Sequence, residues 1–129
     1  NMIYDRLPFE EYIKNLMDSK ISFSPFGMGE ICFRAFECMQ YGTIMIKPNQ
    51  DLVKTIPDIY EPGKTYIDVK YDWSDLEEKI DYILSNFDEL NVEINENIRK
   101  KFMEGYDYRK LCLYWYDIFK NLSGVEQSS

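Results

Sequence analysis

The sequence contains no histidine and only three cysteines. Without histidine, Ser-His-Asp catalysis, Cys-His catalysis and histidine-ligated metal sites are excluded. The cysteines Cys32, Cys38 and Cys112 form no Cys-x-x-Cys pair, so neither a zinc site nor a closed disulfide framework is expected. We interpret all three as small hydrophobic residues of a protein in a reducing compartment.

Basic residues are also few, because 15 Lys and Arg stand against 23 Asp and Glu, for a formal net charge of -8. An acidic surface repels phosphate backbones, so we expect no nucleic-acid partner. No apolar run approaches the roughly 20 residues that cross a bilayer, so no transmembrane segment is expected. No signal peptide is visible, which favours a cytoplasmic location; a lumenal one stays open if the chain continues before Asn1.

What the chain does have is enough apolar material for a folded core. It has 129 residues, of which 45% are hydrophobic and 16% aromatic. That length corresponds to one ordinary domain, and the composition argues against a disordered chain. We therefore expect residues 1–129 to form a single domain.

Apolar residues at helical spacing predict one helix after Pro8 and three more in the last third of the chain. Ser74 and Glu77 have the spacing of a capping box at the start of the second of these helices. The four apolar stripes are Phe9, Tyr12, Ile13, Leu16 and Met17; Leu76, Ile80, Ile83, Leu84 and Phe87; Leu90, Ile94, Ile98 and Phe102; and Leu111, Trp115, Ile118, Phe119 and Leu122.

The first half predicts a strand at 20–24, a helix at 30–41 that ends before Gly42, and a strand at 43–46. This order is typical of a right-handed βαβ unit with parallel strands, and residues 65–69 predict a third strand. The expected fold is α/β: a Rossmann-like three-layer domain with a small parallel sheet and a helical C-terminal third. Three strands are few for such a sheet, so we expect the chain to be the later part of a larger fold.

The helix at 30–41 has an apolar and a polar face. The apolar face carries Cys32, Ala35, Phe36 and Met39, and the polar face carries Glu30, Arg34, Glu37 and Tyr41. The polar face begins beside the carboxyl end of the preceding strand, which is the edge where open α/β sheets bind ligands.

A nucleotide would suit that edge. Gly27 and Gly29 allow a ligand to approach the backbone closely, and the first amides of the helix attract an anion. Arg34 can bind a diphosphate with its planar guanidinium, and Glu37 can accept hydrogen bonds from ribose hydroxyls. The alternative is that Glu30, Arg34 and Glu37 form a solvated ladder of ion pairs.

Residues 24–46 resemble the donor-site segment of GT-B glycosyltransferases, in particular the exostosin-like and glycosyl transferase group 1-like enzymes. The motif comprises a Pro-x-Gly loop, an Arg-x-x-Glu pair on a helix, a small residue and an apolar strand; it is matched here by Pro25, Gly27, Arg34, Glu37 and Gly42. Residues 66–87 are less specifically similar to the strand and helix that close such domains, and the final helices look like the region that returns towards the N-terminal domain.

The resemblance implies a glycosyltransferase of carbohydrate biosynthesis, with this chain as its C-terminal donor-binding part. The donor would be a UDP- or GDP-linked sugar and the acceptor a glycan or another hydroxyl compound. The N-terminal domain of the same enzyme would hold the acceptor. Arg34 would contact the diphosphate and Glu37 the ribose. The backbone of Gly27, Met28, Gly29 and Glu30 would meet the phosphates or the sugar.

The family pattern also implies that neither a metal nor a cofactor is used, because Arg, Lys and helix dipoles neutralise the leaving diphosphate. Lys20 and Lys47 could serve as further cations, although we expect both to be surface charges. This chain alone would bind the donor weakly and turn over little. Glu30 and Glu37 are seven positions apart, one fewer than in the common retaining enzymes, so inversion and retention both remain open; Cys38 replaces the usual alanine.

Aromatic residues cluster in the last helical region, at Tyr106, Tyr108, Tyr114, Trp115 and Tyr116. Such clusters usually pack helices or a domain interface, and stacking on sugars is the alternative. A different function therefore stays open, that of a non-catalytic α/β module in which this region binds a protein.

Overall fold

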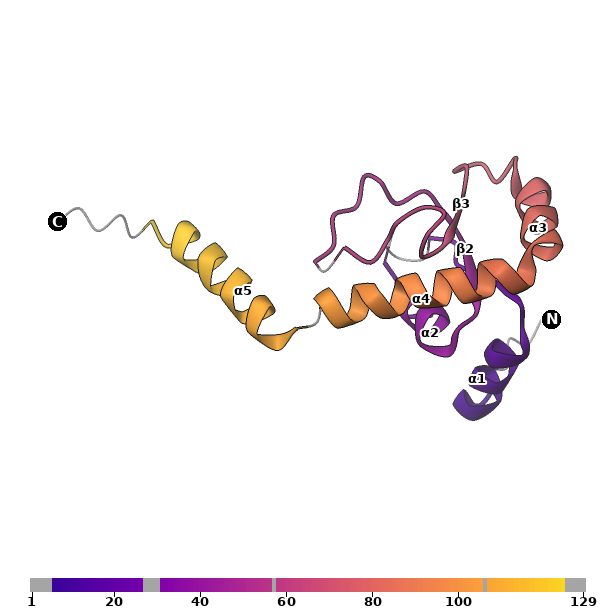
Figure 1. Cartoon of the computed structure of the whole chain (residues 1–129), viewed down its shortest axis with the longest axis horizontal. Helices are drawn as coiled ribbons and strands as arrows, with labels where there is room; N and C mark the ends of the chain where they lie inside the picture. Colours follow the sequence, from indigo (N-terminus) through magenta and orange to yellow (C-terminus); the bar gives the residue numbers. More distant parts are fainter. Residues whose placement is uncertain (1–5, 27–30, 57, 106, 125–129) are drawn as a thin grey trace.

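The computed structural model describes residues 6–26, 31–56, 58–105 and 107–124, and these form a mixed α/β fold with a three-stranded parallel sheet (Figure 1). The α/β class expected from the sequence is confirmed. The described elements are α1 (Phe9–Asp18), β1 (Ile21–Phe23), α2 (Phe33–Tyr41), β2 (Ile44–Pro48), β3 (Ile67–Val69), α3 (Leu76–Ser85), α4 (Phe87–Gly105) and α5 (Tyr108–Leu122).

The sheet has the strand order β1-β2-β3, with both pairs parallel. Ile21 is paired with Ile44, and Ile46 with Ile67. Every residue of β2 is buried, as expected for the central strand of a sheet covered on both faces. The parallel strands predicted on either side of the glycine loop and its helix are therefore confirmed.

The turn between α2 and β2 depends on Gly42. This residue ends α2 with a φ of 78°, a left-handed conformation that suits glycine, and its N–H donates to the Cys38 carbonyl. The next residue, Thr43, is buried and donates its hydroxyl to the Leu16 carbonyl at the end of α1 (2.7 Å). Gly42 thus reverses the chain at the point where α1 is attached to the sheet.

The predicted capping box at the start of α3 is wrong. The helix begins at Leu76, and no side chain caps it. The carboxylate of Asp75 instead accepts the Lys70 N–H (2.9 Å), and that of Asp72 accepts the Ser74 N–H (3.0 Å). Short acidic side chains readily bond to amides of their own turn, and here they stabilise the turn after β3 rather than the helix.

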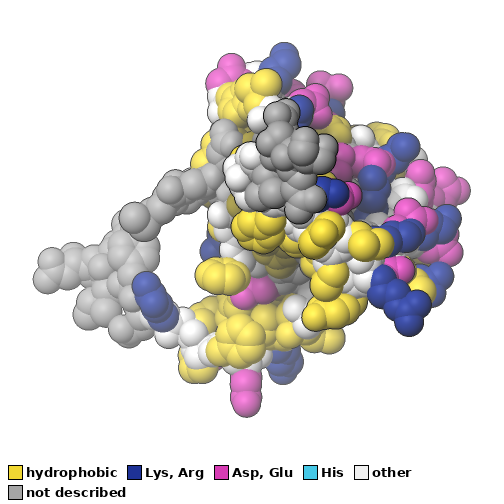
Figure 2. All heavy atoms as spheres, turned by 90° about the vertical axis from the view of Figure 1, so that its left-hand side faces the viewer, with side chains coloured by type: hydrophobic (Ala, Val, Ile, Leu, Met, Phe, Trp, Pro, Cys, Tyr) yellow, Lys and Arg dark blue, Asp and Glu magenta, His cyan; other side chains and the backbone are white. Residues whose placement is uncertain are grey.

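The core lies between the sheet and the helices, and α4 contributes Leu90, Ile94 and Ile98 to it. By contrast, α5 has no buried residue and extends away from the sheet (Figure 1). Seen from the α5 end, hydrophobic side chains gather over much of the surface, with most charged ones on one side (Figure 2). Within the described part of the chain, no helix is both long and apolar enough to cross a membrane.

Candidate functional site

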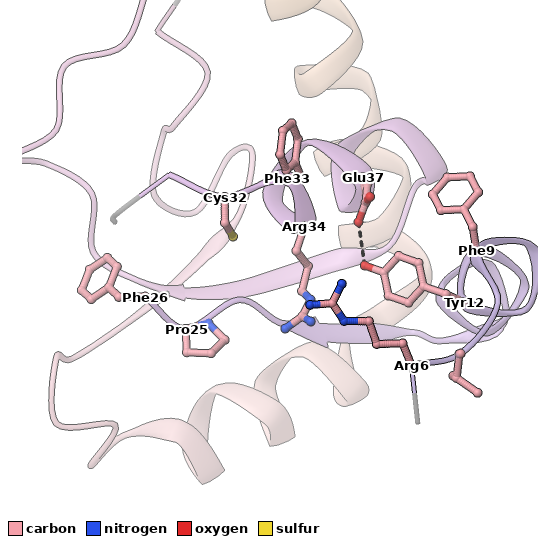
Figure 3. A pocket seen from close by; sticks show the side chains of 10 residues that line it. Arg6, Phe9, Tyr12, Pro25, Phe26, Cys32, Phe33, Arg34 and Glu37 are labelled. Atoms are coloured by element: carbon pink, nitrogen blue, oxygen red, sulfur yellow. Dashed lines mark hydrogen bonds between the residues drawn. The ribbon is translucent and has the colours of Figure 1, made fainter. Parts of the chain in front are cut away.

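A groove of about 630 Å³ lies between α1 and the first turns of α2, where the chain leaves β1 (Figure 3). It is an open surface feature with aromatic walls and charged side chains at its centre. Its lining residues are Arg6, Leu7, Phe9, Tyr12, Pro25, Phe26, Cys32, Phe33, Arg34 and Glu37. The groove thus lies at the edge of the sheet where the sequence predicts a ligand.

Two of the predicted site residues meet in this groove. Arg34 is exposed on the first turn of α2, and Glu37 is half-buried one turn further along. The polar face predicted for this helix is therefore confirmed at both positions. The remaining candidates, Gly27, Met28, Gly29 and Glu30, lie outside the described residues.

Tyr12 of α1 fixes the carboxylate of Glu37. Its hydroxyl donates to Glu37 Oε2 at 2.7 Å, which joins the two helices across the groove (Figure 3). Partial burial and the Glu37 carboxylate raise the pKa of Tyr12, and the Arg34 guanidinium partly opposes them. Tyr12 therefore stays a hydrogen-bond donor at neutral pH, and it holds one oxygen of Glu37 in place.

Arg6 is a groove residue that the sequence analysis missed. Its guanidinium points into the same part of the groove as that of Arg34 (Figure 3). Within the described ranges, neither guanidinium forms an ion pair, since the two ion pairs there join Glu61 to Lys64 and to Lys101. Two neighbouring guanidinium groups that form no ion pair offer a place for an anion, and the Glu37 carboxylate lines the same groove. Nothing in the local pattern around Arg6 distinguishes it from a surface arginine.

The two lysines considered as further cations differ sharply in position. Lys20 is exposed just before β1, with its ammonium 4.7 Å from the centre of the Phe87 ring. Lys47, near the end of β2, is completely buried, so the expectation that it is a surface charge is wrong. Its ammonium donates to the Ser24 carbonyl (3.4 Å) and lies 5.1 Å from the ring centre of Phe26, a wall of the groove.

Cys32 precedes α2 and lines the groove beside the same buried charge. Its Sγ lies 3.4 Å from the hydroxyl of the buried Ser24. Burial alone would raise the pKa of this thiol, but the Ser24 hydroxyl, the nearby Ala35 amide and the Lys47 charge together lower it. Cys32 is therefore part of the groove wall and more acidic than an ordinary thiol.

The other two cysteines lie elsewhere. Cys38 is buried in the core, as expected for a small hydrophobic residue, and burial raises the pKa of its thiol. Cys112, also interpreted as a small hydrophobic residue, is exposed on α5 and does not contribute to the core. Among the described residues, all three cysteines are free.

Chemically, the groove offers paired guanidinium groups, a carboxylate oriented by a tyrosine and several apolar rings. In the described part of the chain, no group of three or more cysteine or carboxylate side chains is placed to hold a metal ion. Comparison of the chain with models of protein families, with curated proteins and with solved structures gives no match.

Proposed function

We propose that this chain is the donor-binding part of a GT-B glycosyltransferase, which transfers a sugar from a nucleoside diphosphate to an acceptor hydroxyl. The convergence of Arg6 and Arg34 beside Glu37 in one groove carries the proposal. The resemblance of residues 24–46 to the family's donor segment supplies the identity of the ligand. The parallel order of the sheet is compatible with the Rossmann-like layers of such a domain.

In this proposal the diphosphate lies between the two guanidinium groups. Planar guanidinium groups bind phosphate oxygens in pairs, and a bound anion removes the repulsion between Arg6 and Arg34. The free lone pairs of Glu37 accept hydrogen bonds from the ribose hydroxyls, while Tyr12 keeps the carboxylate oriented. The rings of Phe9 and Phe26 offer apolar surface for the base or the sugar.

Transfer breaks the bond between the anomeric carbon of the sugar and the diphosphate oxygen, which keeps the electron pair. The acceptor oxygen forms the new bond to that carbon, and its proton passes to a base. Family resemblance assigns the acceptor and the base to a preceding domain. The contribution of this chain is fixed positive charge near the leaving diphosphate: Arg6 and Arg34 in the groove and the buried Lys47 behind its wall.

The direct test is calorimetric titration of the chain with UDP and with GDP. We expect Arg34→Ala to abolish detectable binding, a loss of at least about tenfold in affinity, because it removes one of the two guanidinium groups that would bind the diphosphate. Arg99→Ala, which removes an exposed arginine of α4, is the matched control and should bind like the parent. If Arg34→Ala keeps both its circular dichroism spectrum and its affinity, the assignment is wrong.

A second titration tests whether the charge of Lys47 acts on the phosphates of the ligand or only maintains the fold. Lys47→Met should weaken binding of UDP more than binding of UMP and leave that of uridine unchanged, because the lost charge acts on phosphate. Lys20→Met removes the ammonium before β1, at the opposite end of the sheet, and should leave all three affinities unchanged. Equal losses for UDP and uridine would instead show that Lys47 only maintains the fold.

The alternative function, a non-catalytic interaction module, has one observation in its favour. Apolar side chains of α5 are exposed, among them Trp115 and Phe119, and within the described structure they cover no core. A thermal-shift panel discriminates between the two functions. Stabilisation by nucleoside diphosphates but not by monosaccharides supports the transferase, whereas no response to any nucleotide favours the module.

A further inference from the structure

A second cavity, of about 420 Å³, lies in the loop that follows β2. The loop contains no helix or strand between residues 49 and 56, and its cavity falls within the range of about 300–1,000 Å³ that is typical of small-molecule sites. It shares no lining residue with the groove at α2. The lining residues are Gln50, Asp51, Val53, Lys54, Thr55, Ile56, Asp58 and Tyr60.

Gln50 is the polar residue on which this cavity depends. Its side chain is 1% exposed, and its amide nitrogen donates to the Pro48 carbonyl at 2.9 Å. Its backbone N–H donates to the hydroxyl of the buried Tyr66, also at 2.9 Å. Because the Pro48 carbonyl can only accept, the amide nitrogen must face it, which fixes the side-chain oxygen on the other side.

That oxygen, Gln50 Oε1, has no hydrogen-bond partner among the described residues, and neither has the buried hydroxyl oxygen of Thr55. Pro57, in the same stretch of sequence, has no N–H and cannot supply a backbone donor. Buried polar groups are almost always satisfied in native proteins, by protein, water or ligand. Gln50 and Thr55 together therefore present an acceptor and a hydroxyl that require an outside partner.

The remaining lining residues narrow the class of that partner. Asp51 and Asp58 supply acceptors, Lys54 supplies a donor, and all three are exposed around the cavity. Hydroxyl groups both donate and accept, so they match this mixture; an ammonium ligand could not accept a hydrogen bond from Lys54, and an anion would be repelled by the two carboxylates. Val53 and Ile56 provide apolar surface for carbon–hydrogen groups.

We propose that the loop after β2 binds a monosaccharide unit, whose hydroxyl groups donate to Gln50 Oε1 and bond to Thr55 Oγ1. Both oxygen atoms are buried although both residues line the cavity, so binding requires a shift of the irregular loop that exposes them to the ligand. The site rests on the chemistry of this loop alone and is independent of nucleotide binding in the groove. It takes sugar as a free compound or as a terminal unit of a glycan.

The test is saturation-transfer difference NMR on the whole chain, with the methyl glycosides of glucose, galactose, mannose and N-acetylglucosamine as probes. We expect transfer from at least one probe, with a dissociation constant of about 1 mM. Gln50→Leu should weaken binding at least about tenfold, because it replaces the orphaned acceptor with an apolar group. Gln40→Leu makes the same change at an exposed position of α2 and should bind like the parent.

Thr55→Val provides a second variant, in case Gln50→Leu also disturbs the bond to Pro48. It removes only the hydroxyl, and we expect a loss of several-fold in affinity. Failure of every glycoside to receive saturation overturns the proposal, as does an unchanged affinity in both variants. A response to methylamine with none to the glycosides overturns the sugar assignment, and so does an ordered water as the only partner of Gln50. Comparison of a free glycoside with a glycan that ends in the same sugar distinguishes the two sources.

Discussion

Helices α4 and α5 follow each other in the chain and both carry an apolar stripe, but their surroundings differ. The stripe of α4 is buried against the core at Leu90, Ile94 and Ile98. That of α5 is largely exposed, with 48% of Trp115 and 65% of Phe119 accessible to solvent. Helical spacing identifies a face that can be covered; it does not show what covers it.

Local interactions account for α5 as a helix. Asp107 accepts the N–H groups of Arg109 and Lys110, which caps its first turn. The rings of Trp115 and Phe119 lie one turn apart, with centres 6.1 Å from each other. A helix of 15 residues that is stabilised only by a cap and by contacts between its own side chains is marginally stable by itself. Helix α4, by contrast, gains stability from packing against the core. We therefore expect α5 to unfold at a lower free-energy cost than α4.

The largest difference is expected between core and α5 substitutions. Ile46→Ala, at a fully buried position of β2, should lower the free energy of unfolding by about 3 kcal/mol. Trp115→Ala should change it by no more than about 0.5 kcal/mol, because the ring covers no core. Urea denaturation of both variants measures this. An equal loss for Trp115→Ala would show that α5 is packed in solution.

Two glycines with positive φ provide an intermediate test. Gly42 has a φ of 78° in the turn between α2 and β2, and Gly124 has a φ of 59° after α5. Gly42→Ala should cost about 1–2 kcal/mol, because a Cβ disfavours the left-handed conformation. Gly124→Ala involves the same local strain, but it should leave the global transition unchanged if α5 unfolds separately. Thermal denaturation of the pair, monitored by circular dichroism, decides this.

The smallest effect concerns the end of α4. A hydrogen bond from Lys101 lowers the pKa of Glu61, and the charges of Lys101 and Lys64 act in the same direction. Because the pKa of Glu61 is lower in the folded than in the unfolded state, its carboxylate stabilises the fold at any pH above the unfolded-state pKa. This stabilisation is lost as the pH falls through the folded-state pKa. Glu61→Gln should therefore slightly reduce the fall in the free energy of unfolding that occurs as the pH is lowered. Lys101→Met should reduce this pH dependence of the free energy of unfolding by a similar amount if this part of α4 belongs to the core.

The local sequence predicted most of the elements. Strand β1, the end of α2 at Gly42 and the presence of α4 follow from alternation, a left-handed terminator and a regular stripe, although Phe87, which the helical spacing groups with the preceding helix, begins α4. Because their causes lie within a few neighbouring residues, such features can be recognised without the fold. The start of α3 could not be, since Asp72 and Asp75 bond to turn amides in competition with the capping box.

The candidate site was predictable only where it lies on one helix. Arg34 and Glu37 share a face of α2, so their spacing was sufficient. Arg6 and Tyr12 reach the same groove only because α1 packs against α2, a tertiary contact without a sequence signature. The buried position of Lys47 depends on both neighbouring strands and on Phe26, and a lone lysine in an apolar run does not indicate it.

The strands stand in the sheet in the same order as in the chain, and each pairing spans a single crossover. During synthesis, β2 can add to β1 as soon as α2 and β2 have emerged from the ribosome, and β3 can then pair with the free edge of β2. No strand has to be inserted between two that are already paired. Assembly of this kind requires only moderate loop-closure entropy at each step, which favours rapid folding and limits the time that unpaired edges are open to aggregation.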